Sequence, residues 1–232
     1  MATTLSRYAD LPALIGLMTG DDKHQAATES TLDALWVLYD SVLNISPDRA
    51  DDPGRDRLLL SKGHGPAAYY AVLAAKGFLS VTDLRSWATF ASPLGHHPDR
   101  VLVPGAEISS GSLGHGLGLG VGTALGLRAQ GRRIPRVVVL LGDGELDEGS
   151  NHEAIVTAGR LSLDNLTAVV VDNRSASLGW PHGIAHRFEV EGWKTRTVSG
   201  RDHTALHEAL TGPHAQRPLA VVARATPKGR AA

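Results

Sequence analysis

Two short apolar runs stand out in the pattern of hydrophobic and polar positions along the chain. Residues 136–141 and residues 166–171 are rich in valine and leucine, and each run stops abruptly at small polar residues. Short apolar runs without alternation are typical of strands that are buried on both faces of a parallel sheet. Between the two runs, residues 150–161 show the apolar spacing of a helix. The pattern therefore predicts a strand–helix–strand unit of a parallel α/β sheet.

Weaker patterns on both sides predict more elements of the same class. Further strands are expected over residues 57–60, 193–198 and 219–223. Further helices are expected over residues 11–18, 26–43, 82–90 and 203–210, with one more that begins at Pro66. The chain has 232 residues, which is enough for one α/β domain with a substantial core.

Composition narrows the class of protein. The net charge is −1 and the hydrophobic content is 42%, a globular profile that gives no charge-based reason to expect nucleic acid or a lipid surface as a partner. There is no cysteine, which excludes disulfides and thiolate metal sites. No apolar run approaches the roughly 18 residues of a membrane span, and the N-terminus lacks the pattern of a signal peptide. We therefore expect a cytoplasmic protein.

The two apolar runs end in turns that carry candidate metal ligands. Gly142-Asp143-Gly144 follows the first run, and Asp172-Asn173 follows the second. Parallel α/β sheets bind ligands at the edge where their strands end. Two side-chain oxygens and a backbone carbonyl just beyond the second turn would suit Mg²⁺ or Ca²⁺, which complete their shells with phosphate oxygens and water. Either motif alone could be an ordinary turn, but the pair favours metal-assisted diphosphate binding.

These two motifs resemble those of the transketolase family. Asn173 follows Asp143 at the spacing of the thiamine diphosphate motif, and GDGELDEG is similar to transketolase in particular. The chain departs from the family at Asp172, where an Asn is common, and at His152, where a Trp is common. Further blocks carry the resemblance from about residue 26 to residue 230: HQAATESTLDALWVLY, SKGHG, SPLGHHPDR, SSGSLGHG, GWKTRTVSGRD and ATPKGR.

The resemblance implies a fold and a domain organisation. The fold is the thiamine diphosphate-binding fold of the diphosphate type, which is α/β in three layers, with a mostly parallel central sheet and helices on both faces. Residues 1–232 would form a single domain of this type. The pyrimidine-type and C-terminal domains of transketolase would be absent.

The resemblance also implies a set of site residues. Mg²⁺, or Ca²⁺ in its place, would be held by Asp143, Asn173 and the carbonyl of Ser175. Thiamine diphosphate would be bound by these metal ligands and by His64, Gly111, Leu113, Gly144 and Glu148. Glu148 would also approach the activating Glu of a partner chain, and Glu153 matches a second acidic position near the subunit interface. Acids are favoured in a first helical turn in any case, so a solvated turn is the alternative.

Three histidines match substrate-facing positions of the family: His24, His64 and His97. Imidazole suits the binding of donor hydroxyls and the movement of protons. Each has an alternative interpretation, because a His before a helix is often a capping or solvated residue. His96 does not match the family pattern and is interpreted as a neighbour of His97.

The glycine-dense segment over residues 105–126 predicts a tight turn at Gly111 and then a helix. Glycine inside a helix costs roughly 1 kcal/mol relative to alanine, so its repeated use implies close packing against a sheet, cofactor or partner. We expect a glycine-lined apolar face that associates with itself or with another chain.

The resemblance implies the N-terminal subunit of a two-component transketolase. The missing pyrimidine domain would come from a C-terminal transketolase subunit, with two copies of each chain in a heterotetramer. The complex would transfer a two-carbon ketol unit from a ketose donor to an aldehyde acceptor, with sugars or sugar phosphates as substrates. Two alternatives stay open: a non-catalytic subunit that holds cofactor or acts as a scaffold, and another thiamine enzyme, either deoxyxylulose-phosphate-synthase-like or a secondary-metabolic ketol transferase.

Overall fold

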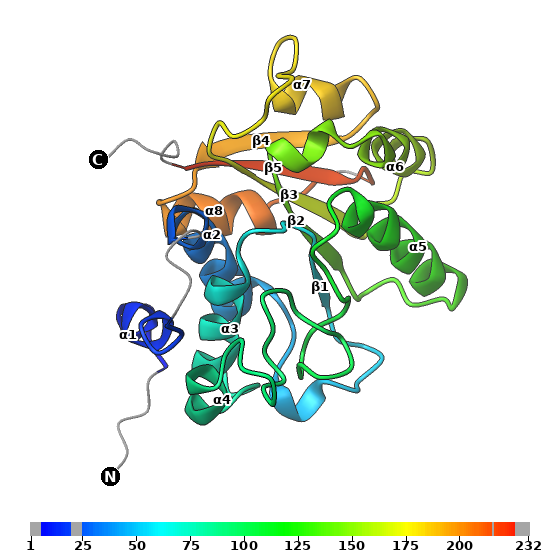
Figure 1. Ribbon diagram of the computed structural model, residues 1–232. Helices are drawn as coiled ribbons and strands as arrows, with labels where there is room; N and C mark the ends of the chain where they lie inside the picture. The colour runs from blue at the N-terminus through cyan, green and yellow to red at the C-terminus, as the bar shows by residue number, and fades with distance from the viewer. Residues whose placement is uncertain (1–5, 20–24, 215, 226–232) are drawn as a thin grey trace.

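A five-stranded parallel sheet forms the centre of the protein (Figure 1). The computed structural model describes residues 6–19, 25–214 and 216–225. The strands are β1 (Arg57–Leu60), β2 (Val137–Gly142), β3 (Leu166–Asp172), β4 (Lys194–Ser199) and β5 (Leu219–Arg224). Their order in the sheet is β1-β2-β3-β5-β4, and every neighbouring pair is parallel. All five predicted strands are confirmed, with ends that move by at most one residue.

Helices cover both faces of this sheet (Figure 1). They are α1 (Leu11–Ile15), α2 (Gln25–Val37), α3 (Pro66–Ala75), α4 (Val81–Arg85), α5 (His115–Ala129), α6 (Gly149–Arg160), α7 (Ile184–Glu189) and α8 (His203–Thr211). Alternation along β3 shows how the layers divide. Val169 and Val171 pack toward α2, α3 and α8, whereas Ala168 and Val170 pack toward α5, α6 and α7. The predicted α/β class, with a parallel sheet between two helical layers, is confirmed.

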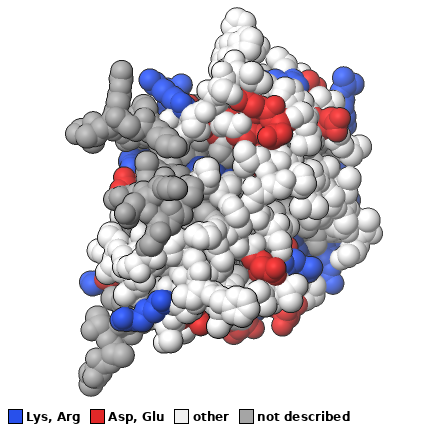
Figure 2. All heavy atoms as spheres, viewed as in Figure 1, with Lys and Arg blue, Asp and Glu red and all other residues white. Residues whose placement is uncertain are grey.

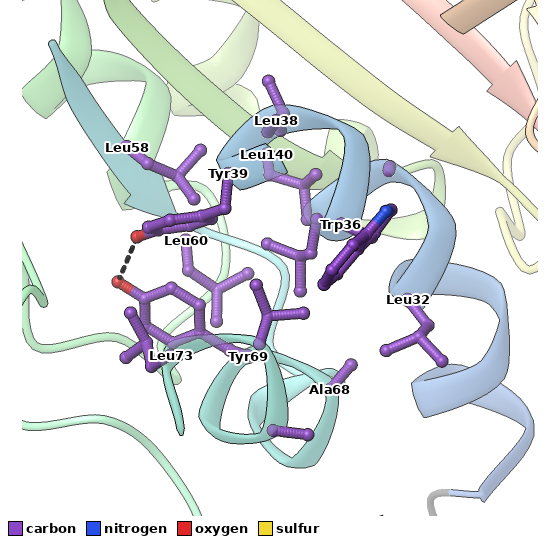
Figure 3. Packing of buried hydrophobic residues seen from close by; sticks show 14 of the residues in the cluster. Leu32, Trp36, Leu38, Tyr39, Leu58, Leu60, Ala68, Tyr69, Leu73 and Leu140 are labelled. Carbon is purple, nitrogen blue, oxygen red and sulfur yellow. Dashed lines mark hydrogen bonds between the residues drawn. The ribbon is translucent and has the colours of Figure 1, made fainter. Parts of the chain in front are cut away.

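The layer of α2 and α3 contains the larger aromatic core (Figure 3). Tyr39 and Tyr69 face each other with their hydroxyl oxygens 3.3 Å apart, and Tyr69 also donates to the carbonyl of Gly105 at 3.1 Å. Leu140 of β2 and Trp36 of α2 lie beside them. Full burial of one such large apolar side chain contributes about 1.5–3 kcal/mol to stability, so this layer fixes α3 and the turn that precedes it.

Glycines bring α5 unusually close to the sheet on the opposite face. A Cβ added at Gly116 would lie 2.3 Å from the Ser61 hydroxyl oxygen, and one at Gly120 would lie 2.5 Å from Cγ2 of Val139. Such distances are too short for any side chain, so only glycine permits this approach. The predicted close packing of the glycine-rich helix is confirmed.

Several helices are shorter than predicted. The first ends at Ile15 rather than residue 18 because Gly16 caps it, and α4 ends at Arg85 rather than residue 90, shortly before Ala88 takes a left-handed backbone conformation with φ of 58°. The long helix predicted over residues 26–43 is α-helical to Val37 and then continues as a π-helical turn, Leu38–Val42. Apolar periodicity predicts where helices pack, whereas caps and local turns decide where they end.

A buried ion pair closes the edge of the sheet where β1 and β2 begin. Asp56 is only 3% exposed and precedes β1. Its carboxylate accepts hydrogen bonds from the backbone N–H of Arg136 at 2.7 Å, from the Arg136 guanidinium at 2.6 Å and from the N–H of Asn44 at 2.9 Å. The charge of this carboxylate is therefore compensated by a cation as well as by N–H donors.

The surface agrees with the charge balance of the sequence. On the face shown in Figure 2, the side chains of Lys and Arg lie singly or in small groups among uncharged and acidic residues, and the described part of this face shows no continuous basic band. None of the helices within the described ranges has the length and apolar character needed to cross a membrane.

Candidate metal and cofactor site

The turn after β2 is joined to the loop after β3 by one buried carboxylate. Asp143 is 1% exposed. Its Oδ1 accepts from the Ser175 hydroxyl at 2.6 Å, and its Oδ2 accepts from the backbone N–H groups of Ser175 at 2.6 Å and Ala176 at 3.2 Å. Two predicted metal ligands, distant in sequence, are thus in direct contact. The geometry arises because β2 and β3 are neighbouring parallel strands that end at the same edge.

Asn173 provides the test of whether these residues fit a metal ion. Its side chain is 6% exposed, and its Oδ1 is buried without a hydrogen-bond partner in the described part of the chain. A buried acceptor left unpaired costs about 1–3 kcal/mol. The backbone carbonyl oxygen of Ser175 lies close to Gly144, 3.3 Å from where a Cβ would stand. A carboxylate, an unpaired amide oxygen and a carbonyl are the hard oxygen donors that Mg²⁺ takes, so the residues fit such an ion.

The predicted cofactor and substrate residues of the other loops form a second group. A Cβ at Gly111 would lie 2.8 Å from the His97 ring, and one at Gly63 would lie 2.9 Å from Cδ2 of Leu113. Gly111 has φ of 126°, which an L side chain rarely adopts, but the turn before α5 lies at Leu113 and Gly114 rather than at Gly111. His64 and His97 are both exposed. The structure therefore brings the turn that carries His64 next to the loop that carries Gly111 and Leu113.

Lys62 connects this second group with the turn after β2. It is 6% exposed, and its ammonium group donates to the backbone carbonyl of His64 at 2.6 Å. Its aliphatic part lies against Gly142, where an added Cβ would stand 3.3 Å from Cγ of Lys62. A positive charge is thus held at the edge of the sheet where an anionic cofactor is expected.

Glu145 lies at the centre of the site and is absent from the residues predicted from sequence. It is 3% exposed. Its Oε1 accepts from the Ser61 hydroxyl and from the Gly114 N–H at 3.0 Å, and its Oε2 accepts from the Gly142 N–H at 3.3 Å. Burial raises the pKa of Glu145 above its usual value, and these hydrogen bonds together with the charge of Lys62 oppose the increase.

The two acidic residues predicted near a subunit interface, Glu148 and Glu153, are both exposed. Glu148 precedes α6, and its Cβ lies 2.7 Å from where a Cβ at Gly114 would stand. Glu148 therefore borders the loop of Gly111 and Leu113, whereas Glu153 lies further along α6. His24, the third predicted histidine, lies outside the described residues.

A second carboxylate holds the loop after β3 in the same way as Asp143 does. Oδ2 of Asp147 accepts from the N–H and the hydroxyl of Ser177, both at 3.0 Å, and from the N–H of Leu178 at 3.3 Å. Further along this loop, Trp180 packs on His152 with ring centroids 4.8 Å apart. An aromatic contact thus exists at the position where the family commonly has Trp and this chain has His152.

Comparison with known proteins agrees with this geometry. Residues 18–228 match the family model described as transketolase, thiamine diphosphate binding domain. The chain belongs to the transketolase family. A crystal structure of transketolase from Pichia stipitis in complex with sedoheptulose-7-phosphate is similar, with a TM-score of 0.77 and 28% sequence identity, and the match covers 94% of this chain and 36% of that one. The chain therefore spans about a third of the length of that solved transketolase.

Curated relatives of more similar length also match. The A subunit of apulose-4-phosphate transketolase from Actinobacillus succinogenes is 34% identical over 210 residues, which are 88% of this chain and 76% of the relative. A protein of Rhodococcoides fascians named ferredoxin fas2 is 60% identical over 219 residues, which are 94% of this chain and 72% of the relative. Ferredoxin clusters are held by cysteine thiolates, and this chain has no cysteine.

Proposed function

We propose that this protein is the N-terminal subunit of a two-component, thiamine diphosphate- and Mg²⁺-dependent transketolase. In this proposal residues 1–232 form the diphosphate-binding domain, and a C-terminal subunit contributes the pyrimidine domain. The observation that carries the proposal is the buried, unpaired Oδ1 of Asn173, in the same loop as Ser175, which is hydrogen-bonded to Asp143. The relative from Actinobacillus succinogenes, which is named as one subunit of a transketolase, supports the division into two chains.

The residues of this chain would act in the reaction as follows. Asp143, Asn173 and the Ser175 carbonyl hold Mg²⁺, and Gly144 lets the backbone approach the diphosphate closely. When bound, thiamine diphosphate supplies the carbanion chemistry for transfer of the two-carbon unit. His64 and His97, which flank the loop of Gly111 and Leu113, hold hydroxyl groups of the donor sugar and move protons. Glu148 contacts the activating Glu of the partner subunit.

The outward face of α5 is the surface that we propose for assembly. Gly118, Gly122 and Gly126 face open space, with no described atom within 4 Å of an added Cβ. Leu119 is 49% exposed between two of them, and Leu113 is 40% exposed at the site. A face of small and apolar residues beside the cofactor loops suits contact with the C-terminal chain and with a second copy of this one, giving a heterotetramer in the cytoplasm.

A two-carbon transfer assay with a ketose donor, an aldehyde acceptor, thiamine diphosphate and Mg²⁺ tests the proposal. The candidate partner is the product of any neighbouring reading frame that encodes a pyrimidine domain. We expect no transfer by either chain alone, and transfer that depends on both concentrations after mixing. Robust activity of this chain alone would overturn the two-component assignment. If no combination is active, the non-catalytic alternative is supported instead, and activity only with an unrelated acceptor would favour another thiamine enzyme.

A further inference from the structure

We propose that Glu145 is a positioning residue that holds the cofactor-facing turns at a fixed spacing. The proposal rests on the assignment of this edge of the sheet as the cofactor site. Glu145 lies in the 3₁₀ turn Gly144–Asp147, between the metal ligand Asp143 and the start of α6. Its side chain points into the protein rather than toward solvent, so it acts through the backbone of its neighbours and not by touching substrate.

The carboxylate connects three turns that are far apart in sequence. The hydrogen bond that Ser61 donates connects Glu145 to the turn after β1, which carries His64. The bond from Gly114 reaches the loop that carries Gly111 and Leu113, and the bond from Gly142 reaches the end of β2. Each of these turns contributes predicted cofactor residues. The distances between them are therefore set in part by one side chain.

Ser61 extends this connection into α5. Its hydroxyl oxygen accepts from the N–H of Gly116 at 3.0 Å while the hydroxyl donates to Glu145. The first N–H groups of a helix have no partner within the helix. Here the N–H of Gly114 donates directly to Glu145. The N–H of Gly116 donates to Ser61, whose hydroxyl in turn donates to Glu145. The direction in which α5 leaves the site is thus coupled to the carboxylate.

A fourth contact comes from α6. Nδ2 of Asn151, which is fully buried, donates to the backbone carbonyl of Glu145 at 2.7 Å. This bond fixes the 3₁₀ turn against the first turn of α6, where Glu148 precedes the helix. The side chain and the backbone of Glu145 therefore form hydrogen bonds with four segments that border the proposed cofactor site.

The donor set explains why a Glu side chain is suited to this position. Three hydrogens, from one hydroxyl and two backbone N–H groups, approach two oxygens that both accept. A Gln side chain has only one acceptor oxygen, so its amide nitrogen would face a donor. A hydrophobic side chain would leave all three donors without their partner, at the cost of burying unpaired polar groups.

The test uses the full-length chain with Glu145→Gln, and Asp56→Asn as a control at the opposite edge of the sheet. Amide hydrogen exchange is measured in the absence of cofactor over residues 61–65 and 111–116. We expect exchange at Gly114 and Gly116 to accelerate by at least about tenfold in Glu145→Gln, as local opening becomes easier. In Asp56→Asn these amides should change no more than the rest of the chain does.

Binding of thiamine diphosphate with Mg²⁺ is then measured by calorimetry on the same proteins, each mixed with the partner subunit. Loss of a group that orients the binding residues typically weakens a metal site about 10- to 100-fold, and we expect that loss in Glu145→Gln but not in Asp56→Asn. Ser61→Ala is a milder second variant that removes only the hydroxyl link. It should accelerate exchange at Gly116 and weaken binding in the same direction.

Unchanged exchange at Gly114 and Gly116 in Glu145→Gln would overturn the proposal, as would unchanged cofactor affinity despite faster exchange. If amide exchange accelerates equally along the whole chain, Glu145 is an ordinary stabilising residue, and this result would also overturn the proposal. If the wild-type chain mixed with the partner subunit binds no thiamine diphosphate while the local exchange effect is present, the proposed function fails and the spacing role of Glu145 is supported.

Discussion

The two edges of the sheet differ in how they compensate their buried carboxylates. Where the strands begin, Asp56 is matched by the guanidinium and the backbone of Arg136. Where the strands end, Asp143 and Glu145 accept only from backbone N–H groups and hydroxyls, and the buried Oδ1 of Asn173 has no partner among the described residues. In the charge of its carboxylates, the first is the complete edge and the second the incomplete edge, although the buried Oδ1 of Asn165, which precedes β3, also lacks a partner among the described residues.

This difference separates residues that hold the fold from residues that await a ligand. A buried carboxylate with an arginine partner is compensated in the native state without any further group. Buried oxygens that lack cations and partners are costly unless a metal ion or substrate completes them. The unpaired oxygen of Asn173 supports the candidate site because it coincides with the sequence motifs, whereas that of Asn165 at the opposite edge does not.

The largest expected effect is at the incomplete edge. Asp143→Ala removes one proposed metal ligand and the acceptor for three hydrogen bonds from Ser175 and Ala176. We expect it to abolish Mg²⁺-dependent binding of thiamine diphosphate in the assembled complex, a loss of more than about 100-fold. Asp172→Asn, which creates the Asn-Asn pair common in the family, is the matched control and should retain binding. Calorimetric titration of both variants decides between these outcomes.

The complete edge should respond in stability rather than in binding. Asp56→Asn leaves the partly buried guanidinium of Arg136 without its charge partner. We expect the free energy of unfolding to fall by about 2–4 kcal/mol, measured by denaturant titration. Cofactor affinity at a concentration of folded protein equal to that of wild type should stay the same. If Asp56→Asn has the wild-type free energy of unfolding but no longer binds cofactor, the distinction between the two edges is wrong.

The exposed histidines should affect turnover and not stability. His64→Ala and His97→Ala remove side chains that lie in loops, so the melting temperature should change little. If they hold donor hydroxyls and move protons, the rate of two-carbon transfer should fall by about 100-fold in each. His96→Ala is the control, because its ring packs on Trp87 and has no proposed role in the reaction. Wild-type rates in both test variants would contradict the assignment.

The smallest effect is expected on α5, whose first residues lie at the site. Gly122 faces open space, so Gly122→Ala should stabilise the isolated chain by up to about 1 kcal/mol through helix propensity. Gly120→Ala should instead destabilise it, because its Cβ would overlap Val139. Thermal unfolding of the two variants gives the comparison. If the outward face contacts the partner, Gly122→Ala should also weaken assembly, and unchanged assembly would argue against that surface.

Much of the fold follows from the sequence because its signals are local. The valine-rich runs specify buried parallel strands, and the glycines of α5 indicate close packing through their number alone. Asp143 and Asn173 stand out as candidate ligands because their chemistry and their place after two strands are both visible in the sequence. Helix ends are harder to predict, since a single residue such as Gly16 decides them.

The roles of Glu145, Asp147 and Ser61 could not be predicted in the same way. The segment GELDEG contains three acids within four positions, and the sequence does not show which of them turns inward. The 3₁₀ turn buries Glu145 and leaves Glu148 exposed. Such a division depends on how three distant turns meet, which is a property of tertiary structure and not of local pattern.

The most direct test of the distinction between the two edges compares Asn173→Ala with Asp56→Asn. Thiamine diphosphate is titrated calorimetrically into the complex of each chain with the partner subunit, with and without Mg²⁺. We predict Mg²⁺-dependent binding by wild type, loss of that binding in Asn173→Ala with little change in the free energy of unfolding, and retained binding in Asp56→Asn. Binding by Asn173→Ala with wild-type affinity and Mg²⁺ dependence would contradict the metal site, because the unpaired oxygen of Asn173 would then have no part in holding the ion.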